Sequence, residues 1–378
     1  MQMSTDRILT THTGSLPRPE ALAKAIDAHD RGTLDAGGER ALPGQVADAV
    51  ADCVRRQREA GVDVVGDGEM SKMVYSTYVR ERLTGFDGED AAPIMGDLLD
   101  YMGYAQRLMG TIDFRSPACT GPVSYTGQEA VQQDIANLRA VVGDSEAFMS
   151  AASPGVASLF LVDRHYGDHE TYLYALADAL KEEYDAIHAA GLLVQLDCPD
   201  LAMGAHITFA DGARIENFPV HVAQHVAAVN HATRDIPREA LRVHLCWGNY
   251  EGPHHQDVPL EDIVDEIVKL DCGALLFEGA NPRHEHEWRV WAEAKLPDDT
   301  ILIPGVIDST SNYIEHPRLV ADRLERFADI VGRERVMAGT DCGMATIATY
   351  NPVEPEIAWS KLRAMADGAE IATSRLWS

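Results

Sequence analysis

Eight short apolar runs, each ending in polar or small residues, constrain the fold of this 378-residue chain more than any other feature. The runs span residues 8–14, 62–69, 148–154, 192–197, 243–247, 274–278, 301–308 and 336–342. Most are rich in β-branched residues and too continuous for strands with one face in water, which is typical of parallel strands buried on both faces. Helical patterns such as 171–190, 260–270 and 317–331 separate them. This alternation predicts a (β/α)8 TIM barrel.

We expect a single catalytic barrel over residues 1–378, with residues 87–125 forming an insertion or edge hairpin within it. A doubly wound sheet is the alternative architecture, but no glycine-rich dinucleotide loop follows the first strand. The N-terminus carries no apolar signal core, and no apolar run approaches the ~18 residues that a membrane span requires.

The net charge and the number and spacing of the cysteines limit the classes of binding partner that we expect. The chain has 60 acidic and 32 basic side chains, a formal net charge of −28, which argues against nucleic acid and anionic membranes as partners. Its six cysteines are scattered, unlike a disulfide framework. We therefore expect a cytoplasmic protein that acts on small molecules, and the sequence leaves a homo-oligomer open.

Polar residues collect where the runs end, and four of them have the chemistry of metal ligands. His244 and Cys246 occupy positions i and i+2 of one strand, so they face the same side. Glu278 and Cys342 end the sixth and eighth runs. Because strand ends converge at one mouth of a barrel, the four can meet there, and this donor set suits Zn²⁺.

The other cysteines and several histidines serve as a contrast. Cys53 and Cys272 are interpreted as small apolar residues within or beside helices, and Cys198 is ambiguous because it follows Asp197. The pairs His254–His255 and His284/His286 are expected in solvated loops rather than in a second site.

A zinc ion with two thiolate ligands favours one kind of reaction. A substrate thiol that takes an exchangeable coordination position loses its proton and becomes a nucleophile at neutral pH. A thiolate-rich ligand set makes the metal less electrophilic, which favours thiol alkylation over hydroxide chemistry. The alternative from another class is a non-catalytic barrel that binds a corrinoid or tetrapyrrole.

Over nearly its whole length the chain resembles the C-terminal catalytic barrel of cobalamin-independent methionine synthase, within the uroporphyrinogen decarboxylase/methionine synthase-like barrels. The segments that carry the resemblance are TTHTGSLPRP, GVDVVGDGEMSK, LLVQLDCPD, VHLCWGNY, FEGAN, PGVID and GTDCGM. The resemblance implies that His244, Cys246, Glu278 and Cys342 are the zinc ligands.

The same resemblance implies a substrate pocket. Ser15 falls where the family binds the acidic end of the thiol substrate, and Glu69 and Asp197 fall where it binds the amino group of homocysteine. Asp308 matches an aspartate near the methyl donor.

Two departures argue against methyltetrahydrofolate as the donor. Thr310 stands where methionine synthases carry a histidine that helps protonate the folate leaving group, and Phe160 replaces a tryptophan that stacks on folate. The segments HLCWGNYEGPHHQDVPL, ANPRHEHEW and GVIDSTSNYIEHP resemble instead a single-barrel branch that includes epoxyalkane:coenzyme M transferase, also called 2-hydroxyalkyl-coenzyme M lyase.

That branch implies epoxide opening by coenzyme M as the leading hypothesis, with methyl transfer to homocysteine as the alternative. Epoxide opening leaves an alkoxide that needs an acid, for which His12, Tyr313 and His316 are the candidates. Asp308 is expected to be the catalytic residue on the donor side. Arg18 is the candidate partner for a sulfonate. Glu69 and Asp197 oppose this reading, because they suit an ammonium group that coenzyme M lacks.

Overall fold

The computed structural model describes residues 1–90, 93–109, 116–209 and 212–378. One parallel sheet holds a strand from each of the eight runs, in the spatial order β1-β13-β12-β11-β10-β8-β6-β2. Its strands are β1 (Leu9–Thr10), β2 (Val65–Gly66), β6 (Ala147–Ala152), β8 (Leu193–Asp197), β10 (Leu241–Leu245), β11 (Ala274–Phe277), β12 (Ile301–Ile307) and β13 (Met337–Thr340). A parallel bridge between Thr11 and Val64 joins the first strand to the second and closes the curl. The predicted TIM barrel is confirmed.

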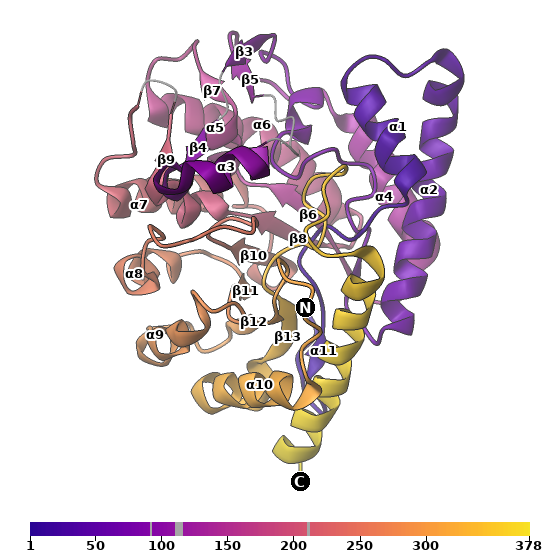
Figure 1. Ribbon diagram of the computed structural model, residues 1–378, viewed down its shortest axis with the longest axis vertical. Helices are drawn as coiled ribbons and strands as arrows, with labels where there is room; N and C mark the ends of the chain where they lie inside the picture. The colour runs from indigo at the N-terminus through magenta and orange to yellow at the C-terminus, as the bar shows by residue number, and fades with distance from the viewer. Residues whose placement is uncertain (91–92, 110–115, 210–211) are drawn as a thin grey trace.

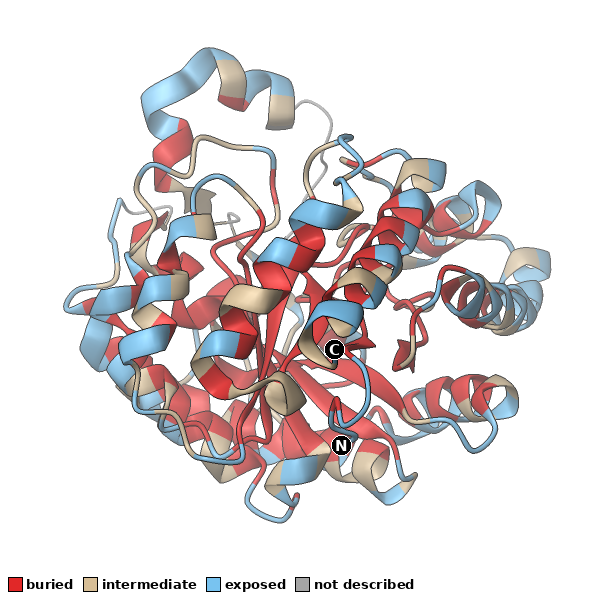
Figure 2. Cartoon of the chain, turned by 90° about the horizontal axis from the view of Figure 1, so that it is seen from below, coloured by how far each residue is buried: buried red, intermediate tan, exposed pale blue. Residues whose placement is uncertain are grey.

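Helices surround this sheet, with their outward faces exposed and their inward faces buried (Figures 1 and 2). The helices are α1 (Glu20–Asp30), α2 (Ala36–Glu59), α3 (Met102–Met109), α4 (Gln128–Val142), α5 (Pro154–Phe160), α6 (His169–Ala189), α7 (Phe218–Ala232), α8 (Val264–Ile267), α9 (Trp288–Glu293), α10 (Pro317–Val331) and α11 (Pro355–Leu376). None of the helices in the described ranges is long and apolar enough to cross a membrane.

The helix starts follow from local sequence. Asp35, Ser153 and Asp168 cap α2, α5 and α6 by accepting hydrogen bonds from backbone N–H groups of the first turn. The helical pattern over 260–270 buries its expected stripe, but only Val264–Ile267 is α-helix. Its flanks turn with i→i−3 hydrogen bonds, such as those of Ile263 and Leu270, which tighten the path into 3₁₀ geometry.

Two small sheets lie outside the barrel sheet. β3 (Gly88–Asp90) pairs antiparallel with β5 (Ser116–Cys119), which pairs in parallel with β7 (Val162–Asp163). β4 (Ile94–Met95) pairs antiparallel with β9 (Ile207–Thr208). Residues 91–92 and 110–115 of the expected 87–125 insertion lie outside the described residues.

The interior of the barrel is not purely apolar. Arg242 on β10 is fully buried and donates hydrogen bonds to the Gln195 side chain, the Thr11 hydroxyl and the His12 carbonyl. Its guanidinium also lies 3.7 Å from the ring centroid of Phe148. This buried arginine ties four strands together below the mouth of the barrel.

Candidate metal centre

Three side chains that could bind a metal ion converge at the carboxyl end of the sheet. His244 lies on β10, Cys246 follows the end of that strand, and Cys342 follows β13. One ligand atom of each lies within 4.8 Å of the others, and all three residues are buried. The alternation of side chains along β10 places His244 and Cys246 on the same side, as their spacing predicts.

Glu278 joins this cluster from the end of β11. Its Oε1 lies 3.8 Å from Cys342 Sγ. The backbone N–H of Trp247 donates to Oε1 at 2.7 Å, and the Asn281 amide donates to Oε2 at 2.6 Å. These bonds fix the carboxylate while lone pairs on its oxygens remain for a metal ion.

Asp341 holds two arms of the cluster together. Its carboxylate accepts hydrogen bonds from the backbone N–H groups of Gly279, Ala280 and Asn281 at 2.8–2.9 Å. The turn after Glu278 is thereby tied to the residue before Cys342. Gly305 makes room for this contact, because a Cβ there would lie 2.0 Å from Asp341 Oδ1.

The donor set fits zinc on its own chemistry. His244 Nδ1 is buried and has no hydrogen-bond partner in the described part of the chain. Burial, with Arg242 nearby, lowers the pKa of His244 to about 3, so the ring is neutral and can act as a ligand. Burial raises the pKa of the Cys342 thiol in the absence of a cation. A buried imidazole, two sulfurs and a carboxylate form a site that a soft divalent cation satisfies.

A small cavity opens beside the cluster at the strand ends. It is lined by Thr13, Gly14, Ser15, Glu69, Tyr75, Asp197, Pro199, His244, Cys246, Asn249, Cys342, Gly343 and Thr346. Among these described lining residues there is no Lys or Arg. The cavity therefore combines two thiols with two carboxylates and no basic side chain other than the His244 imidazole.

The two carboxylates of this cavity are buried and incompletely paired. Glu69 Oε1 accepts from the Ser150 hydroxyl at 2.6 Å, whereas Oε2 is buried with no hydrogen-bond partner among the described residues. Asp197 Oδ1 accepts from the Gln195 amide at 2.7 Å. Burial, followed by the charge of Glu69, raises the pKa of Asp197 to about 7. Lys72 and Arg242 offset part of this shift, but neither forms a hydrogen bond to Glu69 Oε2, which is left without a partner among the described residues.

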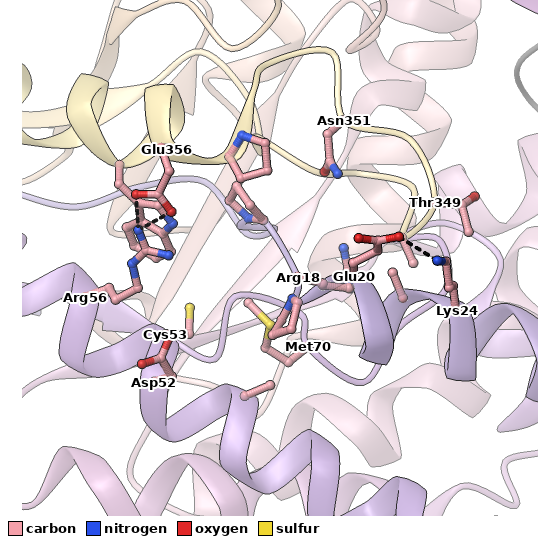
Figure 3. A pocket seen from close by; sticks show the side chains of 17 residues that line it. Arg18, Glu20, Lys24, Asp52, Cys53, Arg56, Met70, Thr349, Asn351 and Glu356 are labelled. Carbon is pink, nitrogen blue, oxygen red and sulfur yellow. Dashed lines mark hydrogen bonds and ion pairs between the residues drawn. The ribbon is translucent and has the colours of Figure 1, made fainter. Parts of the chain in front are cut away.

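Arg18 is placed differently from its expected position. Its guanidinium is buried and donates to the backbone carbonyls of Glu69 and Ala345 at 2.6–3.1 Å. It lies against a separate cavity of about 650 Å³ that is also lined by residues of α1, α2 and α11 (Figure 3). Glu69 has a backbone φ of 57°, which Arg18 and the Asp67 side chain stabilise through its carbonyl and N–H. The arginine positions Glu69 and does not reach the cavity at the cysteines.

Three of the remaining expected residues are Ser15, Asp308 and Phe160. Ser15 lines the cavity, and a Cβ at Gly343 would lie 2.2 Å from its hydroxyl. Asp308 is half-buried and accepts from the Thr310 N–H and hydroxyl at 2.9 Å. Phe160 packs edge-on against Tyr75, with ring centroids 6.5 Å apart.

Three acid candidates lie away from the cavity. His12 is fully buried, hydrogen-bonded to Gln57 at 2.9 Å, and burial lowers its pKa to about 3. Tyr313 is 85% exposed, and His316 caps α10 by accepting the Arg318 N–H. None of the three belongs to the described lining residues, and neither does Asp308, so the catalytic role of these residues stays a prediction.

Two lining residues were missed from the sequence. Tyr75 faces the cavity, and burial, with Cys246 and Asp197 nearby, raises the pKa of its hydroxyl well above its usual value. Asn249 donates to the Gly343 carbonyl at 2.7 Å and so ties the loop after β10 to the loop after β13. Both lie in irregular loops, where sequence periodicity gives no signal.

The expectation of solvated histidines is wrong for His254 and His284. Both bind Asp257 Oδ2, at 2.9 Å and 3.0 Å, and His284 also binds Glu287 at 2.9 Å. Although burial opposes charge on this ring, hydrogen bonds to Asp257 and Glu287 raise the pKa of His284 to about 10. The ring of His284 stacks on Trp247, with centroids 4.0 Å apart, and the backbone N–H of Trp247 donates to Glu278. His255 and His286 are exposed, as expected.

Comparison with known proteins identifies relatives of the whole chain. The chain is 25% identical to a methionine synthase of Sulfurisphaera tokodaii, with 97% of this chain and 93% of that protein covered. It is also 25% identical to a 2-hydroxypropyl-CoM lyase of Xanthobacter autotrophicus, with coverages of 87% and 85%. A B12-independent methionine synthase structure from Shewanella sp. W3-18-1 superposes with a TM-score of 0.73 at 23% identity, covering 98% of this chain and 99% of that one.

The family model described as cobalamin-independent synthase, catalytic domain, matches residues 159–370, more than half of the chain. The matched region contains His244, Cys246, Glu278 and Cys342. The resemblance found in the sequence motifs is confirmed. The chain belongs to the family of cobalamin-independent synthase catalytic domains.

Proposed function

We propose that the protein is a zinc-dependent S-alkyltransferase whose acceptor is an amino thiol of the homocysteine class. One observation carries the proposal. Two buried carboxylates, one with an unpaired oxygen, share a cavity with Cys246 and Cys342, and no lysine or arginine is among the described residues lining it. An ammonium group on the thiol substrate would neutralise these carboxylates.

We assign zinc to His244, Cys246, Glu278 and Cys342. Zinc, when bound, lowers the pKa of a thiol that coordinates it and so supplies a nucleophile at neutral pH. The protein fixes the ligands through the bonds from Trp247 and Asn281 to Glu278. Asp341 keeps the two ligand-bearing loops in register.

The acceptor lies with its ammonium group between Glu69 and Asp197 and its acidic end toward Ser15. Both carboxylates accept hydrogen bonds from the ammonium group, and Glu69 offers its free Oε2. Arg18 keeps Glu69 in position through its backbone carbonyl. The substrate sulfur then points to the cysteines across a cavity too small for a bulky group.

The alkyl donor approaches from the mouth side, where Asp308 and Thr310 lie. The hydroxyl of Thr310 bonds to Asp308 and supplies no histidine-like acid, which favours a donor whose leaving group needs little protonation. Methylcobalamin and other activated methyl donors meet this condition better than methyltetrahydrofolate. Tyr75 is a protonated hydroxyl in the cavity and can donate a hydrogen bond to a departing group.

Epoxide opening by coenzyme M remains the second candidate, because a relative named 2-hydroxypropyl-CoM lyase aligns over most of the chain. A sulfonate would need a cationic partner. Arg18 is the expected cationic partner, but its guanidinium donates its hydrogen bonds to the backbone carbonyls of Glu69 and Ala345. The carboxylates that remain at the cavity would repel a sulfonate.

A small substrate matrix separates these readings. Homocysteine, coenzyme M and glutathione are each paired with methylcobalamin, methyltetrahydrofolate and epoxypropane, using zinc-loaded protein. We expect product from homocysteine with a methyl donor. Product from coenzyme M with epoxypropane alone would refute the amino-thiol proposal. No alkylated thiol in any pair, together with corrinoid binding seen as a shifted visible spectrum, would favour a non-catalytic corrinoid-binding barrel.

A further inference from the structure

Three imidazole rings from helices α6 and α7 form a second cluster, which shares no residue with the cysteine cluster. His169 is the first residue of α6, and His221 and His225 are one turn apart on α7. One nitrogen of each lies within 4.8 Å of the others. Spacing i, i+4 puts two ligands on one face of a helix, which is a common arrangement in metal sites.

The ring of His225 is held from behind by a carboxylate. Its Nδ1 donates to Asp200 Oδ2 at 2.7 Å, and the Ser153 hydroxyl donates to Asp200 Oδ1 at 2.7 Å. All three residues are fully buried. A carboxylate behind a histidine fixes the tautomer and leaves Nε2 as the nitrogen with a lone pair, which is how metal-bound histidines are usually supported.

The backbone of α5 (Pro154–Phe160) is shaped around this pair. A Cβ at Gly155 would lie 2.0 Å from Asp200 Oδ2 and 2.3 Å from His225 Nδ1. Only glycine allows the helix to approach so closely. The histidine and its carboxylate are therefore built into the packing of α5 against α7 rather than placed there incidentally.

The nitrogens that face the centre of the cluster are poorly satisfied. His169 Nε2 and His225 Nε2 are 2.9 Å apart and share one hydrogen bond. His221 Nε2 is buried and has no partner within the described residues. Zn–N bonds of ~2.0–2.1 Å in a tetrahedron put ligand nitrogens roughly 3.3 Å apart. The rings of His221 and His225 pack against each other, with centroids 3.7 Å apart and planes tilted by 43°, so a metal ion would require these rings to rotate.

We propose that His169, His221 and His225 form a second metal site, which binds a divalent transition-metal ion of the zinc class. Nitrogen-only ligands suit Zn²⁺, Co²⁺, Ni²⁺ and Cu²⁺. Binding through His169 Nε2 requires the tautomer of this neutral ring that carries its proton on Nδ1, so the hydrogen bond to His225 is replaced with no net release of a proton. Because His169 is exposed while the other two are buried, the fourth position faces water.

This site connects to the substrate cavity through one short loop. Asp200 lies in the 3₁₀ turn Pro199–Leu201 directly after β8, and Pro199 lines the cavity together with Asp197. The Ser153 N–H also donates to the Asp197 carbonyl at 3.2 Å. A metal ion at the three histidines would therefore brace the loop that carries Asp197, independently of what the cysteine centre binds.

Untagged protein carrying Cys246→Ser and Cys342→Ser isolates this site, since it removes both sulfurs of the cysteine cluster. We expect this variant to bind one Co²⁺ or Zn²⁺ per chain, with cobalt d–d bands but no sulfur charge-transfer band. Adding His169→Gln should abolish that binding, and this exposed position keeps the variant folded. His231→Gln is the matched control, because His231 lies on α7 with His221 and His225 but binds Asp178.

Two further measurements keep the test decisive. Asp200→Asn should weaken binding by roughly 10- to 100-fold, as expected for loss of a carboxylate behind a ligand. If the double cysteine variant does not fold, saturated wild type should hold one more ion per chain than His169→Gln. Equal metal content in these two proteins, or binding that His169→Gln leaves unchanged, would overturn the proposal and reduce the three rings to a packing cluster.

Discussion

Replacing Glu69 by glutamine removes one of the two carboxylates assigned to the substrate ammonium group and preserves the shape of the side chain. The glutamine oxygen can still accept the Ser150 hydroxyl, and the backbone contacts from Arg18 are untouched. The substitution therefore changes the charge at the unpaired Oε2 position and little else.

The magnitude follows from the loss of one charge-assisted hydrogen bond in a buried setting. Such bonds contribute about 1.5–3 kcal/mol, and 1.4 kcal/mol is a factor of ten. We expect homocysteine to bind Glu69→Gln roughly 10- to 150-fold more weakly than wild type. The compound 4-mercaptobutanoate has the same chain without the amino group, so its affinity should change little.

The assay is calorimetric titration of both thiols into zinc-loaded protein, with Glu251→Gln as a control. Glu251 is exposed in the loop after β10, so that variant removes one negative charge without touching the cavity. Equal weakening of both thiols by Glu69→Gln would show that Glu69 only supports the loop. An unchanged homocysteine affinity would refute the assignment of the ammonium site.

Three further predictions concern the surroundings of the metal centre. Asp341→Asn replaces one acceptor oxygen that receives backbone N–H groups, and should weaken zinc binding roughly 10- to 100-fold in a chelator competition; wild-type affinity would contradict this. Gly305→Ala pushes a methyl group against Asp341 and should lower the free energy of unfolding by about 1–3 kcal/mol in urea titrations, whereas no change would show that the strands shift freely. The raised pKa of His284 means that its charge stabilises the fold fully below about pH 6.5 and that this contribution is lost as pH rises toward about 10. The stability gap between wild type and His284→Gln should therefore narrow by up to about 1.4 kcal/mol per pH unit in that window, and a constant gap would be inconsistent with a buried imidazolium.

The barrel and the meeting of His244, Cys246, Glu278 and Cys342 at its mouth could be predicted because both follow from strand geometry. Continuous apolar runs identify buried parallel strands, and i, i+2 spacing places His244 and Cys246 on one side. The convergence of strand ends then brings Glu278 and Cys342 to the same mouth. Nothing in that reasoning needs knowledge of how loops pack.

The rest of the site depends on contacts between distant loops. The sequence cannot show that Arg18 donates to the Glu69 carbonyl rather than to a ligand, since both roles use the same guanidinium. His284 is buried only because Asp257 and Glu287 converge on it. The pair His221 and His225 is visible in the sequence, but only the fold brings His169 to it.

The central claim is that a metal ion held by Cys246 and Cys342 binds the substrate thiol. Cobalt-substituted protein tests this directly, in the His169→Gln background so that the three-histidine cluster does not contribute. We predict a sulfur-to-cobalt charge-transfer band that grows when homocysteine is added and is unaffected by homoserine, which has oxygen in place of sulfur. Absence of the band, or a band that homocysteine leaves unchanged, would contradict the account.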